Sequence, residues 1–474
     1  MAAEASAPRK LPKKPEDSQG SAGKAPDGIR AWAPYSPDPE RPWNLARAGH
    51  LLRRAAFGAF WSELSRALEE GPERAVGRLL APEADVEGFH RAEDGLEASA
   101  MQSDSTDSLR GWWLRRMLRT PHPLLEKMTL FWHGFFGVSN ARVKDSLLMS
   151  RHVRHLRRHA LGSFEEMLLG IAGDPATLVA LGAAANRKAR PGEHLARIFL
   201  QEYTVGPGRF GEEDVLGLAR SFTGWFVLRG ELRYFAREFD PGTRTILGRE
   251  GAFDAEGAVR VLLRDPATPR HVVRELYRWL ISETEDPPED LLAPLAEAFS
   301  RDYRIGSVVE KMLRSSLFFS REAYRRRVKG PVEFALGIVK ALEGDCRAAA
   351  LGAALASLGQ DLYRPPTVKG WTGGARWLQW SSLTGRANLA WALLHEEGNG
   401  LDPLAVARKH GHEGAEPAAA FLSSLLLADD LEDGPRAATL DALKGEEAGA
   451  PGDASGKLRL FTHLITTLPE FQLA

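Results

Sequence analysis

The chain has 474 residues, of which 43% are hydrophobic and 26% are charged, a composition typical of soluble globular proteins. Its 62 Lys and Arg residues against 63 Asp and Glu residues give a net charge of −1, which excludes proteins that bind nucleic acid or anionic membranes through their overall charge. The single cysteine, Cys346, excludes an internal disulfide and a cysteine-based metal site, and we expect it to be a buried apolar residue.

The N-terminal segment, residues 1–42, contains eight prolines and many charged residues. Such a segment buries too little apolar surface to offset the entropy of ordering it, so we expect it to be disordered. It has no apolar run that would serve as the core of a signal peptide. No segment of the chain has the ~20 apolar residues that span a bilayer. These features predict a cytoplasmic protein without membrane contact.

Residues 43–442 are predicted to form one large, mainly α domain, because apolar residues recur there with helical spacing. The first predicted helices lie in 108–120, 123–136, 145–162 and 163–173, and later ones in 193–204, 212–223, 269–282, 290–301, 305–317, 331–342, 346–358 and 383–396. One stretch, 232–248, instead reads as a small β-hairpin that turns at Asp240-Pro241-Gly242. A flexible linker is predicted at 443–456, followed by a C-terminal helix, 457–474, that packs on the core.

The glycine-rich word GPGRFG, residues 206–211, matches the pattern of dinucleotide-binding loops. That reading requires a strand before the word and a βαβ unit around it, whereas the preceding segment looks helical. We therefore interpret it as a loop between two helices. The sequence contains no P-loop, H-E-x-x-H, C-x-x-C or G-x-S-x-G word, and we expect no cofactor and no metal.

Two clusters invite a functional interpretation but have a simpler one. The segment 151–160, RHVRHLRRHA, places three histidines on one flank of a helix and three arginines, Arg151, Arg154 and Arg158, opposite its apolar stripe. The arginines would repel a metal ion, and a solvated basic face or an anion contact fits them better. Four tryptophans gather in 368–391, where we favour burial in the core over stacking on a ligand; they are Trp371, Trp377, Trp380 and Trp391.

The predicted helix 193–204 has one narrow polar stripe on an otherwise apolar surface. Glu193, His194, Arg197 and Gln201 form this stripe, because they fall within about 60° of one another on a helical wheel. Glu202 lies inside the apolar arc and, if buried, needs a partner. We expect that partner to be Arg220 on the next helix.

The segment that contains this helix, NRKARPGEHLARIFLQEYTVGPGRFGEEDVLGLARSFTGW (186–225), resembles the core motif of a large bacterial family known as domain of unknown function 1800. Further words agree in order and spacing over residues 45–474, among them HLLRRAAFG (50–58), EKMTLFWHGFFGVS (126–139), FDPGTRTILGREGAFD (239–254) and RPPTVKGWTGGARW (364–377). The resemblance implies a helix-rich bacterial protein of unassigned activity. Many relatives look exported and are encoded beside a sulfatase-like protein, which the resemblance suggests as a partner.

The chain departs from the family pattern at four positions. Typical members have a second histidine at the position of Phe135, Asn at His194, and Glu at both Ile198 and Gln201. The resemblance implies that the two Glu would form a carboxylate pair beside Arg197, and this chain has neither. Polar residues that match the family remain, and they complete the candidate site: His133, Glu193, Arg197, Arg220, Lys369 and Trp371, with Lys369 and Trp371 as ligand-binding candidates.

Three functions follow from these features. The first is a non-catalytic scaffold or interaction protein that has lost the family carboxylates. The second is a hydrolase-like or ligand-binding enzyme with a pocket formed by His133, Glu193, His194 and Arg197. The third is nucleic-acid or anion binding through the basic helix, for which nucleic acid is the weaker expectation because the chain has no net positive charge.

Overall fold

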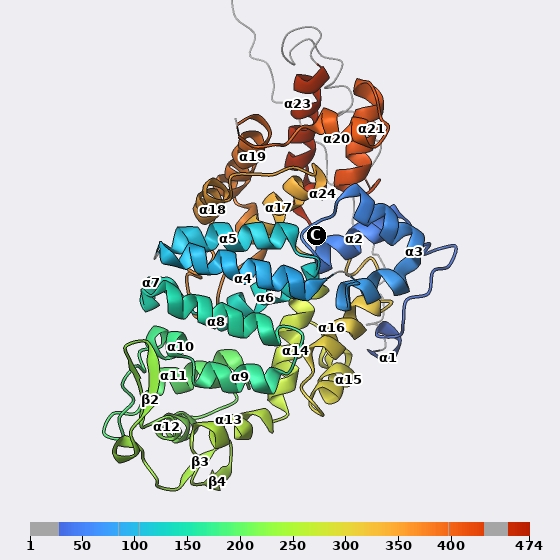
Figure 1. Ribbon diagram of the computed structural model, residues 1–474. Coiled ribbons are helices and arrows are strands. Elements are labelled where there is room, and N and C mark those ends of the chain that lie inside the picture. Colours follow the sequence, from blue (N-terminus) through green and yellow to red (C-terminus); the bar gives the residue numbers. More distant parts are fainter. Residues whose placement is uncertain (1–27, 84, 104, 397, 431–453) are drawn as a thin grey trace, which may run out of the picture.

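The structure, a computed structural model, describes residues 28–83, 85–103, 105–396, 398–430 and 454–474. Helices dominate these residues, and the only strands among them form two short antiparallel hairpins (Figure 1). The prediction of a mainly α fold is confirmed. One continuous hydrophobic core runs through the described chain, from Trp32 near its beginning to Phe471 near its end.

The first part of the chain forms a layered stack of helices. α5, α4, α6 and α8 follow one another down Figure 1; α4 packs on α5, α6 packs on α8, and α5 also contacts α6 and α8. Side chains fix where these helices begin: Asp145 caps α8 and Ser163 caps α9 by accepting a backbone N–H of the first turn. The helices of this part are α1 (Gly28–Ala31), α2 (Leu45–Ala55), α3 (Trp61–Leu80), α4 (Val86–Gln102), α5 (Thr106–Arg119), α6 (Pro123–Phe136), α7 (Asn140–Val143), α8 (Ser146–His159), α9 (Phe164–Ala172) and α10 (Pro175–Ala180).

The segment before α2 is part of the folded domain. Trp32 is buried, and its indole N–H donates to the carbonyl of Leu291 at 2.7 Å. Tyr35 is also buried and stacks near Phe319. The prediction of disorder for residues 1–42 therefore does not hold for its described part, because two aromatic anchors tie that part to the core. Residues 1–27 lie outside the described residues.

A helix with an irregular second half follows. α11 (Glu193–Ile198) continues into a π-helical turn, η1 (Phe199–Tyr203), and a loop at 206–211 leads to α12 (Glu212–Ser221). The predicted helix over 193–204 is confirmed, and so is the loop reading of GPGRFG. A π-turn includes one more residue than an α-turn, which moves the side chains after Ile198 off the regular helical wheel.

The strands form two hairpins rather than the one predicted at 232–248. β1 (Trp225–Leu228) pairs with β2 (Glu231–Tyr234), and β3 (Arg244–Ile246) pairs with β4 (Arg249–Gly251). Each turn consists of two residues with positive φ, Arg229-Gly230 and Leu247-Gly248, as tight hairpin turns require. Asp240-Pro241-Gly242 instead connects the hairpins, because the Asp240 carboxylate accepts the Gly242 N–H and the Arg220 guanidinium.

The second half of the chain covers two sides of the stack. In Figure 1, α14, α15 and α16 lie beside α9, and α19, α20, α21 and α23 form the end opposite the strands. None of the helices in the described ranges combines the length and apolar character needed to cross a bilayer. The helices are α13 (Ala255–Leu263), α14 (Ala267–Leu280), α15 (Glu289–Phe299), α16 (Ile305–Arg314), α17 (Pro331–Ala341), α18 (Ala348–Ser357), α19 (Trp380–His395), α20 (Pro403–Lys409), α21 (Ala415–Leu427), α23 (Ala454–Thr467) and α24 (Pro469–Gln472), with 3-10 turns η2 (Ala236–Glu238) and η3 (Gly374–Leu378).

The predicted linker, 443–456, falls mainly outside the described residues, and its last three residues already belong to α23. The predicted C-terminal helix is two helices, α23 and α24, because Pro469 begins a new one. α23 packs on α19, α20 and α21.

Candidate functional site

A pocket of about 430 Å³ opens between α6, α14 and the segment 360–377. It joins two regions that the sequence analysis singled out, the Trp132-His133 region of α6 and the segment that carries Lys369 and Trp371. Both ligand-binding candidates line this pocket, and so does Phe135, one of the four departures from the family pattern.

Aromatic side chains form the walls of the pocket. Phe131 and Phe135 come from α6, Trp279 from α14, and Trp371 and Trp377 from the 360–377 segment. The ring centres of Phe131 and Trp279 are 5.6 Å apart, and those of Phe131 and Phe135 are 6.0 Å apart. Such a surface offers flat apolar faces to a ligand with a ring.

Two indole N–H groups at this pocket lack a protein acceptor. Trp279 Nε1 and Trp371 Nε1 are buried, and neither has a hydrogen-bond partner among the described residues. An unpaired buried donor costs about 1–3 kcal/mol, and buried tryptophan N–H groups usually find an acceptor. Each indole therefore keeps an N–H donor that no described protein group uses.

Close backbone contact holds the 360–377 segment against α6. Gly370 has a φ of +71°, and a Cβ at that position would collide with the carbonyl of Gly134 in α6. Gly137 ends α6 in the left-handed conformation, with a φ of 56°, and a Cβ there would collide with Val368 O. Only glycine permits this approach, so the Trp371 side of the pocket is fixed to the helix that carries Phe131 and Phe135.

Charged side chains of both signs line the pocket. Glu275 and Arg278, from α14, lie 3.8 Å apart and are partly exposed. Glu283 follows the same helix, and its Oε1 accepts the backbone N–H of Val328 at 2.5 Å. Burial raises the pKa of Glu283, and nearby Arg327 offsets this rise only in part. Glu283 is therefore the acid in this pocket that most readily retains a proton.

Behind the pocket lies a buried network of charges centred on Glu333. Its carboxylate accepts hydrogen bonds from the Lys127 ammonium and the Arg327 guanidinium. The Arg327 guanidinium also lies 4.3 Å from the ring centre of Trp279. Burial raises the pKa of Glu333, but Arg327 and Lys127 outweigh burial and lower it to about 2. Burial lowers the pKa of Lys127 to about 8. This network holds Arg327 in the pocket wall.

His133 backs the pocket without lining it. Its side chain is fully buried, its Nε2 accepts the backbone N–H of Tyr363 at 3.0 Å, and its ring centre is 5.4 Å from that of Trp371. Burial is the main cause that lowers the pKa of His133, and the nearby His152 lowers it further, to about 3. His133 is thus a neutral side chain that positions the 360–377 segment.

The polar stripe of α11 does not converge with His133. Glu193 and His194 are exposed, and Arg197 pairs with Glu212 at 2.7 Å, where both side chains are accessible to solvent. Ile198, in contrast, is buried in the core. The pocket predicted from His133, Glu193, His194 and Arg197 is therefore not assembled in the structure.

Glu202, in η1, pairs with Lys369 of the pocket lining and not with Arg220 as predicted. Arg220, the expected partner of Glu202, pairs with Asp240 at 2.7 Å and lowers the pKa of Asp240 to about 2. Glu202 instead accepts Gln201 Nε2 at 2.8 Å and lies 3.4 Å from Lys369 Nζ. A carboxylate thus stands next to Gln201, at the end of the pocket marked by Lys369.

The basic helix α8 is largely neutralised. Arg151 pairs with Glu231 at 2.9 Å and Arg154 with Glu97 at 2.8 Å, while Arg158 is exposed. The three histidines have separate partners: His152 contacts Asp174, His155 contacts the carbonyl of Met167, and His159 contacts Glu166. In the described part of the chain, no three His, Cys, Asp or Glu side chains gather as a metal site would require.

The remaining candidates divide between core and surface. Trp377 is buried, but Trp380 is 87% exposed and Trp391 is 47% exposed, so the expectation of burial is wrong for these two. Cys346 is half-buried, and burial raises the pKa of its thiol to about 11. Such a thiol is a poor nucleophile at neutral pH.

The sequence analysis missed Glu275, Arg278, Trp279, Glu283 and Arg327. The first four lie on α14 or just after it, and Arg327 precedes α17. No local pattern distinguishes these residues from surface charges or core aromatics. Only their approach to residues 360–377 reveals a pocket.

Comparison with known proteins places the chain in a family. No curated protein and no solved structure matches it. The sequence model described as "Protein of unknown function (DUF1800)" matches residues 50–473. That match covers nearly the whole chain, as the resemblance in its motifs predicted, and the protein therefore belongs to the DUF1800 family.

Proposed function

We propose that this protein binds a small ligand with a polyhydroxylated ring, such as a sugar, in the pocket between α6, α14 and residues 360–377. The observation that carries the proposal is the pair of indole N–H groups, of Trp279 and Trp371, that have no acceptor among the described residues. They belong to a pocket of about 430 Å³ with aromatic walls, within the size range of small-molecule sites.

The chemistry of the lining favours a ring with hydroxyl groups. Flat indole faces pack on the apolar face of a ring, the indole N–H groups donate, and Glu283 and Gln360 supply acceptors for hydroxyl donors. The pocket contains acids and bases together, which disfavours a ligand with a strong net charge.

The proposal describes a binding protein and assigns no catalytic role to α11. Glu193, His194 and Arg197 lie away from the pocket, and Ile198 cannot ionise. These features support the expectation that this family member acts without the carboxylate pair of its relatives. The sulfatase-like partner and the cytoplasmic location remain predictions from the sequence.

Binding is tested by titrating the protein with a panel of monosaccharides and disaccharides while recording tryptophan fluorescence and calorimetric heats. We expect Trp371→Ala to lose binding at least tenfold, since stacking and a hydrogen bond are both removed. The control is Trp391→Ala, which removes a half-exposed tryptophan outside the pocket lining. No binding by any sugar, or equal binding by the wild type and Trp371→Ala, would contradict the proposal.

One observation favours a second function, a hydrolase-like enzyme. Glu283 has a raised pKa and shares the pocket with Glu275, and a carboxyl group that retains its proton is suited to general acid catalysis. In that case, water would cleave the glycosidic bond of a disaccharide that binds and release its two monosaccharides, and Glu283→Gln would abolish this turnover but leave binding intact. A bound disaccharide recovered unchanged after long incubation excludes this alternative for that disaccharide.

A further inference from the structure

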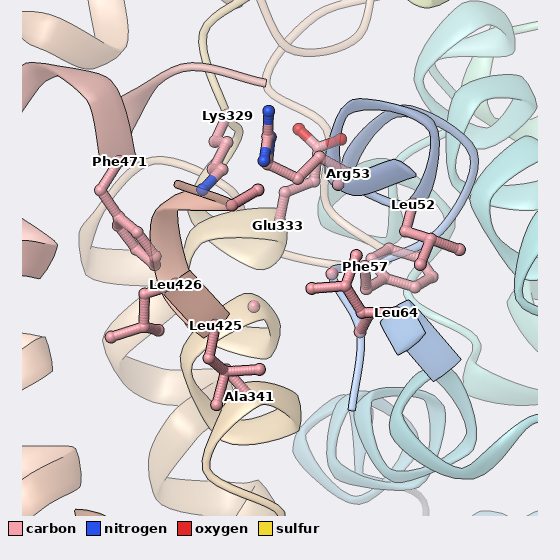
Figure 2. Close-up of a pocket in the computed structure, with 15 residues that line it drawn as sticks. Leu52, Arg53, Phe57, Leu64, Lys329, Glu333, Ala341, Leu425, Leu426 and Phe471 are labelled. Carbon is pink, nitrogen blue, oxygen red and sulfur yellow. The ribbon is translucent and has the colours of Figure 1, made fainter. Parts of the chain in front are cut away.

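A second cavity, of about 40 Å³, lies between α2, α17, α21 and α24, and Glu333 is part of its lining. Figure 2 shows its composition: Lys329, Arg53 and Glu333 lie along one side, and apolar side chains such as Leu425 and Ala341 lie along the other. The cavity is too small for a sugar, but it exceeds the roughly 10–15 Å³ that one water requires.

Lys329 brings an amine without an ion pair to this cavity. Its side chain is 5% exposed, and its Nζ forms no hydrogen bond or ion pair with a described residue. Its nearest described partner is the ring of Phe471, whose centre is 3.7 Å from Nζ. A ring satisfies an ammonium only in part, because the ammonium has three N–H donors.

The acid that lines the cavity does not neutralise Lys329. Glu333 Oε1 accepts Lys127 and Arg327, and its Oε2 accepts the backbone N–H of Gly330 at 2.7 Å. Arg53, the other cation in the lining, bonds Tyr324 Oη at 3.3 Å and pairs with no carboxylate in the described part of the chain. Lys329 and Arg53 therefore both lack an ion pair among the described residues, and Glu333 opposes the effect of burial on Lys329 only in part.

We propose that this cavity is a binding site for a small monovalent anion such as chloride, held between the Lys329 ammonium and the Arg53 guanidinium. An anion there supplies both the acceptor and the negative charge that the lining lacks. The apolar wall excludes larger or strongly hydrated anions. The site is distinct from the ligand pocket and does not depend on the function proposed for that pocket.

The anion would also stabilise the charged form of Lys329. In its absence, burial lowers the pKa of Lys329 strongly, Arg53 and Arg325 lower it further, and Glu333 opposes them only in part. A negative charge in the cavity opposes both effects. Occupancy of the site is thus coupled to the stability of the folded chain.

The test is the melting temperature in sodium chloride and in sodium gluconate at one ionic strength. Gluconate is too large for the cavity, so chloride should raise the Tm of the full chain by roughly 1 °C or more relative to gluconate. Lys329→Met should abolish this difference. The matched control is Lys340→Met, since Lys340 is also buried and lies over a phenylalanine ring, but pairs with Glu63 at 3.1 Å outside the cavity.

Equal Tm in the two salts for the wild type, or the same chloride effect in Lys329→Met, would overturn the proposal and leave only water in the cavity. If Lys329→Met does not fold, a crystal of the wild type soaked in sodium bromide tests whether an anion occupies the cavity. An anomalous bromide peak between Lys329 and Arg53 supports the proposal. The absence of such a peak after prolonged soaking refutes the proposal.

Discussion

The replacement of Glu126 by Gln tests how much the fold depends on buried ion pairs. Glu126 is fully buried in α6, between Arg116 of α5 at 2.6 Å and Arg157 of α8 at 2.8 Å, and it also accepts Trp113 Nε1 at 2.9 Å. It therefore joins three layers of the helical stack. Glu126→Gln keeps the shape of the side chain but leaves two buried guanidinium groups without a counter-charge.

The magnitude follows from the pKa of Glu126. Burial raises this pKa, but Arg157 and Arg116 outweigh burial and lower it from 4.5 to about 2. A shift of this size corresponds to about 3 kcal/mol of folding free energy at neutral pH. Breaking a buried ion pair by removing one partner costs about 3–5 kcal/mol, so the two arguments agree. Because the folded pKa is depressed, the contribution is complete above pH 4.5 and is lost as the pH falls toward 2.

The measurement is urea unfolding of the wild type and Glu126→Gln, followed by circular dichroism between pH 7 and pH 4. The free energy of unfolding should differ by about 3 kcal/mol at pH 7, and the difference should begin to narrow below pH 4.5. Glu212→Gln is the control, since the Glu212–Arg197 pair is exposed and its loss should leave stability unchanged. A difference under about 1 kcal/mol, or one independent of pH, would refute the reasoning.

Two further substitutions test the pocket wall and the π-turn. Gly370→Ala should lower the Tm markedly more than Gly248→Ala. Both positions have positive φ, +71° and +73°, but only at Gly370 would a Cβ collide with backbone. An equal loss of Tm in the two variants would mean that the contact with α6 is not tight. Tyr203→Phe should reduce the free energy of unfolding by about 1 kcal/mol, since the hydroxyl of this buried residue donates to Phe136 O at 2.6 Å, and an unchanged urea midpoint would contradict that assignment.

The helices could be predicted because their causes are local. Apolar spacing, together with caps such as Ser163 and terminators such as Gly137, placed the predicted helices close to where the structure has them. The hairpins were harder, because Asp240-Pro241-Gly242 has the composition of a tight turn. The long-range pair with Arg220 made it a connection instead.

The candidate site could be predicted only in part. Lys369 and Trp371 line the pocket, as predicted. Glu193, His194 and Arg197 share one face of α11 and were therefore predicted to form a pocket with His133, but that face is in contact with solvent. The residue that joins α11 to the pocket, Glu202, has its partner Lys369 far along the chain. Such pairings depend on tertiary packing, about which helical spacing carries no information.

The glycine contact between α6 and the 360–377 segment also determines how the pocket responds to an occupant. Where Gly370 meets Gly134, backbone touches backbone, and there is no side chain whose rotamer change would let the two parts shift. The backbones that carry Phe135 and Trp371 should therefore keep one spacing whether the pocket is empty or full. A ligand that fits would meet a surface already ordered during folding, so that little conformational entropy is lost on binding. Rings too wide for the gap would be rejected rather than accommodated.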